Sequence, residues 1–154
     1  MAMDYEQVYV AQVAFGAKDT QTLRAFLEAE SYEGPSLIIA YSPCIAHGVD
    51  LSNNLRQQGL AMRSGHWPLL RYDPRRAELG KSPLHLDSAK PSISYRDFAA
   101  TETRFSVLWR THPEAAEQLM REAQADVEAR YRHYQELAIA PADTRARSEE
   151  SKES

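Results

Sequence analysis

The chain has 154 residues, of which 43% are hydrophobic and 26% are charged, and its formal net charge is -4 at pH 7. This length suits one domain, and a globular domain of this size buries about 70% of the surface that its unfolded chain exposes. The slightly acidic balance gives no electrostatic reason to expect nucleic-acid binding, and no apolar run approaches the roughly 20 residues of a membrane span. Since the first residues also lack the basic and apolar regions of a signal peptide, we expect a cytoplasmic protein that binds neither nucleic acid nor membrane.

The beginning of the chain predicts a strand followed by a helix. Residues 8–14 are rich in β-forming side chains and carry no charge. Gly16 then supplies a turn, and Asp19 or Thr20 can cap a helix over 22–30. The apolar residues of this helix recur at helical spacing and therefore share one face, which consists of Leu23, Phe26 and Leu27.

A second strand is expected over 37–41, after Gly34 and Pro35 end the helical unit. The run is continuously apolar, which is typical of a strand covered on both faces in a parallel sheet. The order is thus β–α–β, and the loop that contains Cys44 is expected at the carboxyl end of the second strand. In open α/β sheets, ligands bind in the crevice outside these strand ends.

The middle of the chain predicts one further helix and two short strands. Asp50 or Ser52 can cap a helix that ends near Ser64, with an apolar side made of Leu51, Leu55 and Met62. The runs 67–72 and 83–86 suit short extended segments separated by a turn-rich, charged stretch. Because each run contains proline, which cannot donate a ladder hydrogen bond, the pair suits a sheet edge or an extended loop.

From Ser94 onward the pattern is helical. A first apolar stripe, which ends before residue 111, comprises Tyr95, Phe98, Phe105, Leu108 and Trp109. Pro113 suits the first position of a longer helix over about 113–137, whose apolar positions are Ala116, Leu119, Met120, Ala123, Val127, Tyr131 and Tyr134. We expect one domain over 4–138, followed by a disordered charged tail over 139–154.

Cys44 is the only cysteine of the chain, and its chemistry allows three interpretations. It can be a buried small hydrophobe, which is common for cysteine. It can be a nucleophile with His47 as its base, although only proximity in sequence favours that pair. It can be a metal ligand, but the remaining histidines show no metal-ligand spacing; they are His66, His85, His112 and His133.

An iron–sulfur site suits the position of Cys44 but not the count of cysteines. A cluster usually takes four thiolates, so three ligands would have to come from elsewhere. The chain also lacks both glycine-rich phosphate-binding signatures and any complete catalytic constellation.

Several collinear segments between residues 4 and 137 carry a recognisable pattern. The most specific blocks are Cys-Ile-Ala-His-Gly at 44–48 and Trp-Pro-Leu-x-Arg-Tyr-Asp-Pro at 67–74, which accompany the segments 8–17, 22–30 and 34–42. Together they resemble the C-terminal part of the pyruvate:ferredoxin (flavodoxin) oxidoreductases.

The resemblance implies a fold and an activity. The fold is α/β, part of a thiamine diphosphate-binding domain with three α/β/α layers and a mostly parallel sheet, followed by C-terminal helices. Members of the family are large, usually homodimeric enzymes that oxidatively decarboxylate pyruvate to acetyl-CoA. They use thiamine diphosphate, magnesium and 4Fe–4S clusters, and they pass electrons to ferredoxin or flavodoxin. The cysteine that matches Cys44 supplies one ligand of the cluster nearest the thiamine, and the other three ligands lie upstream.

The chain also departs from the family pattern. The thiamine diphosphate and magnesium motif, the other cluster cysteines and the pyruvate-binding domain all precede the matched part and are absent here. Members commonly carry His before the matching cysteine, where this chain has Pro43. We therefore expect a fragment, a split-gene product or a decayed C-terminal piece that is inactive alone.

Two functions follow from the resemblance. The first is the C-terminal portion of such an oxidoreductase, working beside its remainder as an upstream segment or a separate subunit. The alternative is a non-catalytic remnant or interaction module that keeps the α/β fold. Because the family places further strands of this sheet before the matched part, we expect the isolated chain to expose a strand edge and apolar surface. It should therefore be poorly soluble, self-associate, or be stable only beside a partner that carries the missing strands, with Cys44 near that contact.

Overall fold

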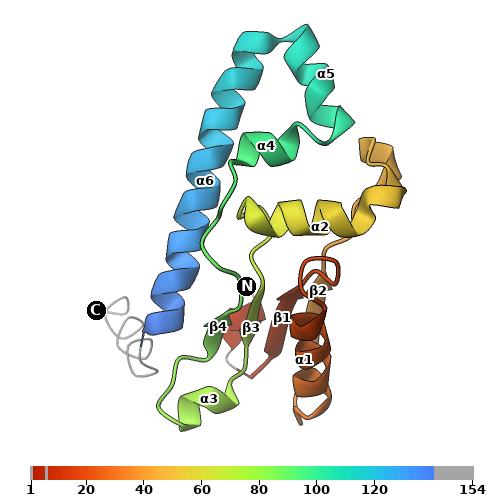
Figure 1. Cartoon of the computed structure of the whole chain (residues 1–154). Coiled ribbons are helices and arrows are strands. Elements are labelled where there is room, and N and C mark those ends of the chain that lie inside the picture. The colour runs from red at the N-terminus through yellow and green to blue at the C-terminus, as the bar shows by residue number, and fades with distance from the viewer. Residues whose placement is uncertain (1, 6, 141–154) are drawn as a thin grey trace, which may run out of the picture.

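The computed structural model describes residues 2–5 and 7–140 and has the α/β class that the sequence indicates (Figure 1). The described strands are β1 (Tyr9–Val13), β2 (Ser36–Ala40), β3 (Leu70–Tyr72) and β4 (Leu84–Leu86). The α-helices are α1 (Asp19–Glu30), α2 (Asn54–Arg63), α3 (Arg75–Glu78), α4 (Tyr95–Ala99), α5 (Thr103–Thr111) and α6 (Pro113–Ile139). Short 3-10 helices are η1 (Ala2–Tyr5), η2 (Ile45–His47) and η3 (Leu51–Asn53).

The described strands form one mixed sheet in the order β2-β1-β3-β4. β1 and β2 are parallel, with Val13 opposite Ala40, so α1 is the crossover helix of the predicted β–α–β unit. The pairs β1–β3 and β3–β4 are antiparallel. The two short segments expected around 67–72 and 83–86 therefore pair with each other, but only β4 lies at the sheet edge, while β3 lies inside the sheet.

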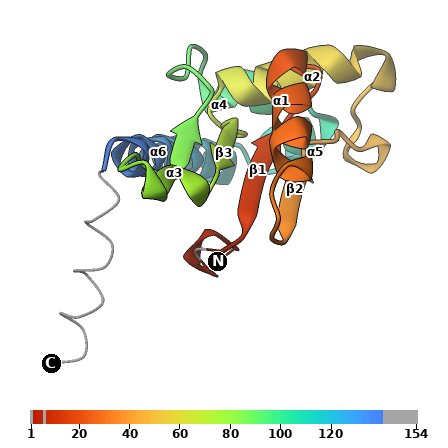
Figure 2. The same ribbon diagram turned by 90° about the horizontal axis from the view of Figure 1, so that it is seen from below.

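Helices cover both faces of this sheet and give it three layers. On one face, Ala25 of α1 packs in a cluster with Tyr9, Ala11 and Val13. On the other face, the last turns of α6 pack against buried residues of the strands, which are Val10, Leu70, Tyr72 and Leu84. Figure 2 shows α1 alongside β1 and β2, and α6 on the side of β3 and β4.

Helix α1 packs on the sheet with a different face from the one that its apolar spacing suggests. Its predicted apolar face, Leu23, Phe26 and Leu27, is exposed by 62%, 56% and 57%. The buried residues are instead Gln21, Thr22 and Ala25. Polar side chains can face the sheet here because they have partners: Gln21 donates to Asp87 Oδ2 at 3.1 Å, and Glu28 pairs with Arg71. The helix cap also differs from the prediction, since Lys18 occupies the N-cap position without a side-chain cap bond.

Strand β2 forms one edge of the sheet and is the more exposed of the two edge strands. The expectation of a strand covered on both faces holds for β1, whose residues are largely buried, but it is wrong for β2. Ile38 packs against the α1 layer, whereas Leu37 and Ile39 are 41% and 40% exposed. The reason is that α6 packs over β4 at the opposite edge rather than over β2.

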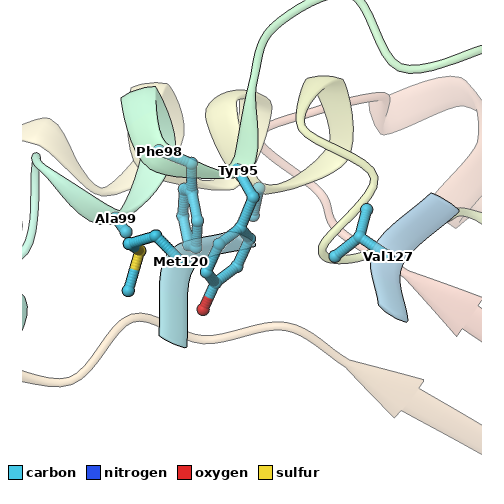
Figure 3. Close-up of a cluster of buried hydrophobic side chains, with 6 residues drawn as sticks. Tyr95, Phe98, Ala99, Met120 and Val127 are labelled. Carbon is cyan, nitrogen blue, oxygen red and sulfur yellow. The ribbon is translucent and has the colours of Figure 1, made fainter. Parts of the chain in front are cut away.

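A second core lies between the helices. Tyr95, Phe98 and Ala99 of α4 belong to one cluster with Met120 and Val127 of α6. Figure 3 shows Tyr95, Phe98, Ala99 and Met120 close together, with Val127 farther along α6. Ala61 of α2 completes the cluster. This core fixes α2 and α4 against the first half of α6, away from the sheet (Figure 1).

The C-terminal helices follow the sequence prediction with two differences. The helical stretch from Ser94 is broken in two, because α4 ends at Ala99 and α5 begins at Thr103. Ser94 caps α4 through a capping box with Asp97. The long helix α6 is confirmed and includes residue 139, but Leu119, expected in its apolar stripe, is 47% exposed.

The helix predicted after Asp50 is also confirmed in part. Asp50 accepts a hydrogen bond from the Ser52 N–H at 2.9 Å and caps η3, which leads into α2. Leu51 and Leu55, expected on the apolar side, are 52% and 56% exposed. The residues 141–154 of the expected tail lie outside the described residues. Within residues 2–5 and 7–140, no helix is long and apolar enough to cross a membrane.

Candidate functional site

Cys44 lies where the sequence predicts it, in the segment that follows β2 and leads to α2. Figure 1 shows the course of the chain between these two elements. Its side chain is exposed, and its backbone is extended, with φ -119° and ψ 133°, just before η2. The interpretation as a buried core filler is therefore wrong for this chain. The thiol instead stands at the carboxyl end of a pair of parallel strands, the edge at which α/β sheets bind ligands.

The loop around Cys44 has a defined backbone on both sides of the thiol. Pro43 is buried directly before it. Gly48 ends η2 in the left-handed region with φ +74°, and its N–H donates to the Ile45 carbonyl at 2.8 Å. Glycine adopts this conformation without the penalty that a Cβ brings. Pro43 and Gly48 thus shape the loop on the two sides of the thiol.

The described residues give no support to Cys44 as a nucleophile. The side chain of His47 lies outside the part that the structure describes, so its pairing with Cys44 stays a prediction. His66 is half-buried and stacks on Phe98 with ring centroids 4.9 Å apart. Burial and the nearby Arg130 charge lower the pKa of His66, which favours a neutral, structural imidazole.

Exposed apolar side chains accompany Cys44 near this edge of the sheet. The loop after β1 lies against α2: a Cβ placed on Gly16 would come within 2.6 Å of Leu55 Cα, and the Gly16 N–H donates to Gln58 at 2.8 Å. The exposed apolar residues of these two loops and the start of α2 are Phe15, Ile45, Leu51 and Leu55. Sequence reasoning missed this group because helical spacing shows that residues share a face but not whether anything covers it.

The Trp-Pro-Leu-x-Arg-Tyr-Asp-Pro block has a structural part in the fold. Arg71 of β3 is 6% exposed and binds Asp87 in a bidentate arrangement, with both N–O distances 2.8 Å, while its third nitrogen contacts Glu28 of α1. Hydrogen bonds to Asp87 raise the pKa of Arg71. Burial acts to raise the pKa of Asp87, but the hydrogen bonds and charge of Arg71 outweigh it and lower that pKa. Arg71 of this block thus ties α1 to the sheet. The sequence feature that could have revealed this role is an arginine within an otherwise apolar strand.

The described residues fit one ligand of an iron–sulfur cluster and no complete metal site. No three His, Cys, Asp or Glu side chains among them gather closely enough to hold a metal ion. Cys44 offers one exposed thiol, and a cluster usually takes four thiolates. The remaining ligands would have to come from outside this chain.

Fold and site therefore define an α/β protein that presents a single thiol at the carboxyl edge of a parallel strand pair. No protein-family model matches the chain. Over 138 residues, or 90% of its length, it is 53% identical to the pyruvate-flavodoxin oxidoreductase of Nostoc sp. and 49% identical to the pyruvate:ferredoxin oxidoreductase of Moorella thermoacetica. Over 136 residues it is 49% identical to a probable pyruvate-flavodoxin oxidoreductase of Escherichia coli.

The chain is thus a homologue of one segment of the pyruvate:ferredoxin (flavodoxin) oxidoreductases, as the sequence blocks implied. It spans 12% of the length of each of these relatives. Most of the length of such an oxidoreductase therefore has no counterpart in these 154 residues.

Proposed function

We propose that the chain serves as one part of a pyruvate:ferredoxin (flavodoxin) oxidoreductase, in which Cys44 supplies one thiolate to a 4Fe–4S cluster. The remainder of the enzyme, on an upstream segment or a separate subunit, supplies the other three ligands and the residues for thiamine diphosphate and magnesium. The assembled enzyme, a homodimer in the cytoplasm, oxidatively decarboxylates pyruvate and reduces ferredoxin or flavodoxin. The chain alone is inactive.

The observation that carries this proposal is the match of about half of all residues to such oxidoreductases, together with the exposed thiol at the sheet edge. A cluster ligand must be reachable from outside the segment that carries it when the other ligands belong to another part of the protein. An exposed cysteine in a loop with a defined backbone meets that requirement. A bound cluster would carry electrons, and the role of this chain is to hold and orient one of the sulfur atoms that bind it.

A chimera tests the proposal. In the Nostoc relative, this chain replaces the 138-residue segment that it matches. We expect pyruvate-dependent reduction of flavodoxin to be retained. Cys44→Ala, which offers no ligand atom, should abolish it and remove about four iron atoms per polypeptide, because a 4Fe–4S cluster usually depends on all four of its thiolates. Ser42→Ala, at an exposed position two residues away in the same loop, is the matched control and should keep both iron and activity.

Two results would contradict the proposal. Full iron content in Cys44→Ala would exclude Cys44 as a ligand. A folded chimera without the cluster and without activity, beside an active Nostoc parent, would favour the non-catalytic remnant. In that case Pro43→His tests whether the residue before the cysteine is the cause. The isolated chain should show no magnesium-dependent binding of thiamine diphosphate in a calorimetric titration.

A further inference from the structure

We propose that two adjacent residues at the start of α5, Glu102 and Thr103, are positioning residues that hold the Cys44 loop at its two ends. Thr103 binds the exit of the loop at Gly48, and Glu102 binds its entrance at Tyr41. That this positioning serves a cluster ligand rests on the function proposed above. The contacts themselves are a property of the described chain.

The contact at the exit of the loop is short and close-packed. The Thr103 hydroxyl donates to the Gly48 carbonyl oxygen at 3.0 Å. A Cβ added to Gly48 would clash with the Thr103 side chain, so the loop backbone approaches this side chain as closely as glycine allows. The left-handed turn that ends η2 is thereby held against α5, although it is 55 residues away in the chain.

The contact at the entrance of the loop centres on a buried carboxylate. Glu102 is 2% exposed, and its Oε1 accepts hydrogen bonds from Gln57 of α2 at 3.2 Å and from the Tyr41 hydroxyl at 3.5 Å. Arg104 Nε lies 2.7 Å from its Oε2 as an ion pair without hydrogen-bond alignment. Burial of a charge is costly unless partners compensate it, so these groups hold one another in place.

The two contacts together restrain the segment that carries the thiol. Tyr41 also continues the ladder of β1 through its N–H to the Val13 carbonyl at 3.0 Å and packs on Trp67, with ring centroids 5.4 Å apart. Residues 42–47 therefore connect Tyr41 and Gly48, which are both held at the start of α5. A ligand held in this way loses less conformational entropy when it binds than one on a free loop.

The isolated full chain provides the test, because Cys44 is its only cysteine and accepts a single nitroxide spin label. Thr103→Val removes the hydroxyl at nearly constant shape, and Thr103→Ser keeps it. Thr111→Val is the matched control on the same helix, where the hydroxyl bonds to carbonyls of α5 and to the adjacent His112 and makes no contact with the Cys44 loop. Tyr41→Phe tests the entrance of the loop. The measurements are the mobility of the nitroxide and the hydrogen exchange of the Gly48 amide.

We expect Thr103→Val to speed exchange of the Gly48 amide by about fivefold to tenfold, the factor that corresponds to one lost hydrogen bond. The nitroxide should also become more mobile, while Thr103→Ser and Thr111→Val should match the parent chain. Tyr41→Phe should raise nitroxide mobility less, because its bond to Glu102 is longer. Unchanged spectra and exchange in both Thr103→Val and Tyr41→Phe would overturn the proposal, as would equal loosening in Thr111→Val. None of these measurements depends on iron, so they are independent of the chimera's outcome.

Discussion

The two helices that cover the sheet, α1 and α6, differ in what their outer sides present to solvent. The outer side of α6 is rich in exposed charged and polar residues, as in a helix that faces water. The outer side of α1 presents Leu23, Phe26 and Leu27, so this helix is apolar on the side that points away from its own sheet. A helix that buries one side and keeps an apolar surface on the other is typical of a position between two layers.

The two edges of the sheet differ in the same way. Both end the sheet, but β4 is packed against α6, whereas β2 carries the exposed side chains of Leu37 and Ile39. Free strand edges and contiguous apolar surface are features that proteins usually cover. Because Ile38 packs toward α1, its neighbours Leu37 and Ile39 lie on the opposite face of the sheet, so α1 and β2 present two separate exposed apolar surfaces.

The largest expected effect contrasts one phenylalanine from each region. Phe98 is fully buried in the core between α4 and α6, and Phe26 is 56% exposed on α1. Phe98→Ala should lower the free energy of unfolding by about 4 kcal/mol through lost burial and a new cavity. Phe26→Ala should change it by less than about 1 kcal/mol in the isolated chain. Denaturant unfolding followed by circular dichroism measures both. A comparable loss in Phe26→Ala would mean that the outer side of α1 is covered within this chain.

The second prediction concerns the ionic tie between α1 and the sheet. Arg71→Met removes the arginine partner of the buried Asp87 carboxylate, which keeps only Gln21 and His85, and should cost about 3 kcal/mol at neutral pH. The folded pKa of Asp87 is lowered, so its contribution to stability is fully present above the unfolded value of about 3.9 and is lost as the pH falls through the folded value.

The parent chain should therefore lose stability steadily as the pH falls below about 4. Arg71→Met should lose much less over the same range, because burial without Arg71 acts to raise the pKa of Asp87. Unfolding titrations at stepped pH values measure this difference. Parallel curves for the two proteins would show that Arg71 does not set the ionisation of Asp87.

The smallest effect on stability is expected when charge is added to the outer side of α1. This change tests directly whether that exposed apolar side causes self-association. Leu23→Glu together with Leu27→Glu should reduce the light scattering of the isolated chain at micromolar concentration several-fold while leaving its melt almost unchanged. The matched control places the same two charges at Leu79 and Leu119, which are 71% and 47% exposed on other elements. A parent chain that is already monomeric and melts cooperatively would contradict the expected self-association. An equal reduction of light scattering in the control would show that added net charge, and not the position on α1, causes the effect.

Local sequence was enough to predict most elements of the fold. The β–α–β order, the parallel pairing of the first two strands and the long helix from Pro113 follow from short-range rules, because strand formers, turn residues and helical spacing act over a few residues. The break between α4 and α5 was not predicted. Helical spacing continued through it, and the carboxylate of Glu102 is held there by Gln57 and Arg104, which sequence reasoning did not connect.

The position of Cys44 at the end of a parallel strand was determined by the sequence alone, since strand order and loop length place it there. The tertiary structure decided which side of each element is covered. Arg71 draws the polar side of α1 onto the sheet and turns Leu23 and Leu27 outward, and the start of α5 meets the Cys44 loop from 55 residues away. Such choices depend on partners that are distant in the chain, and hydrophobic spacing within one element carries no information about them.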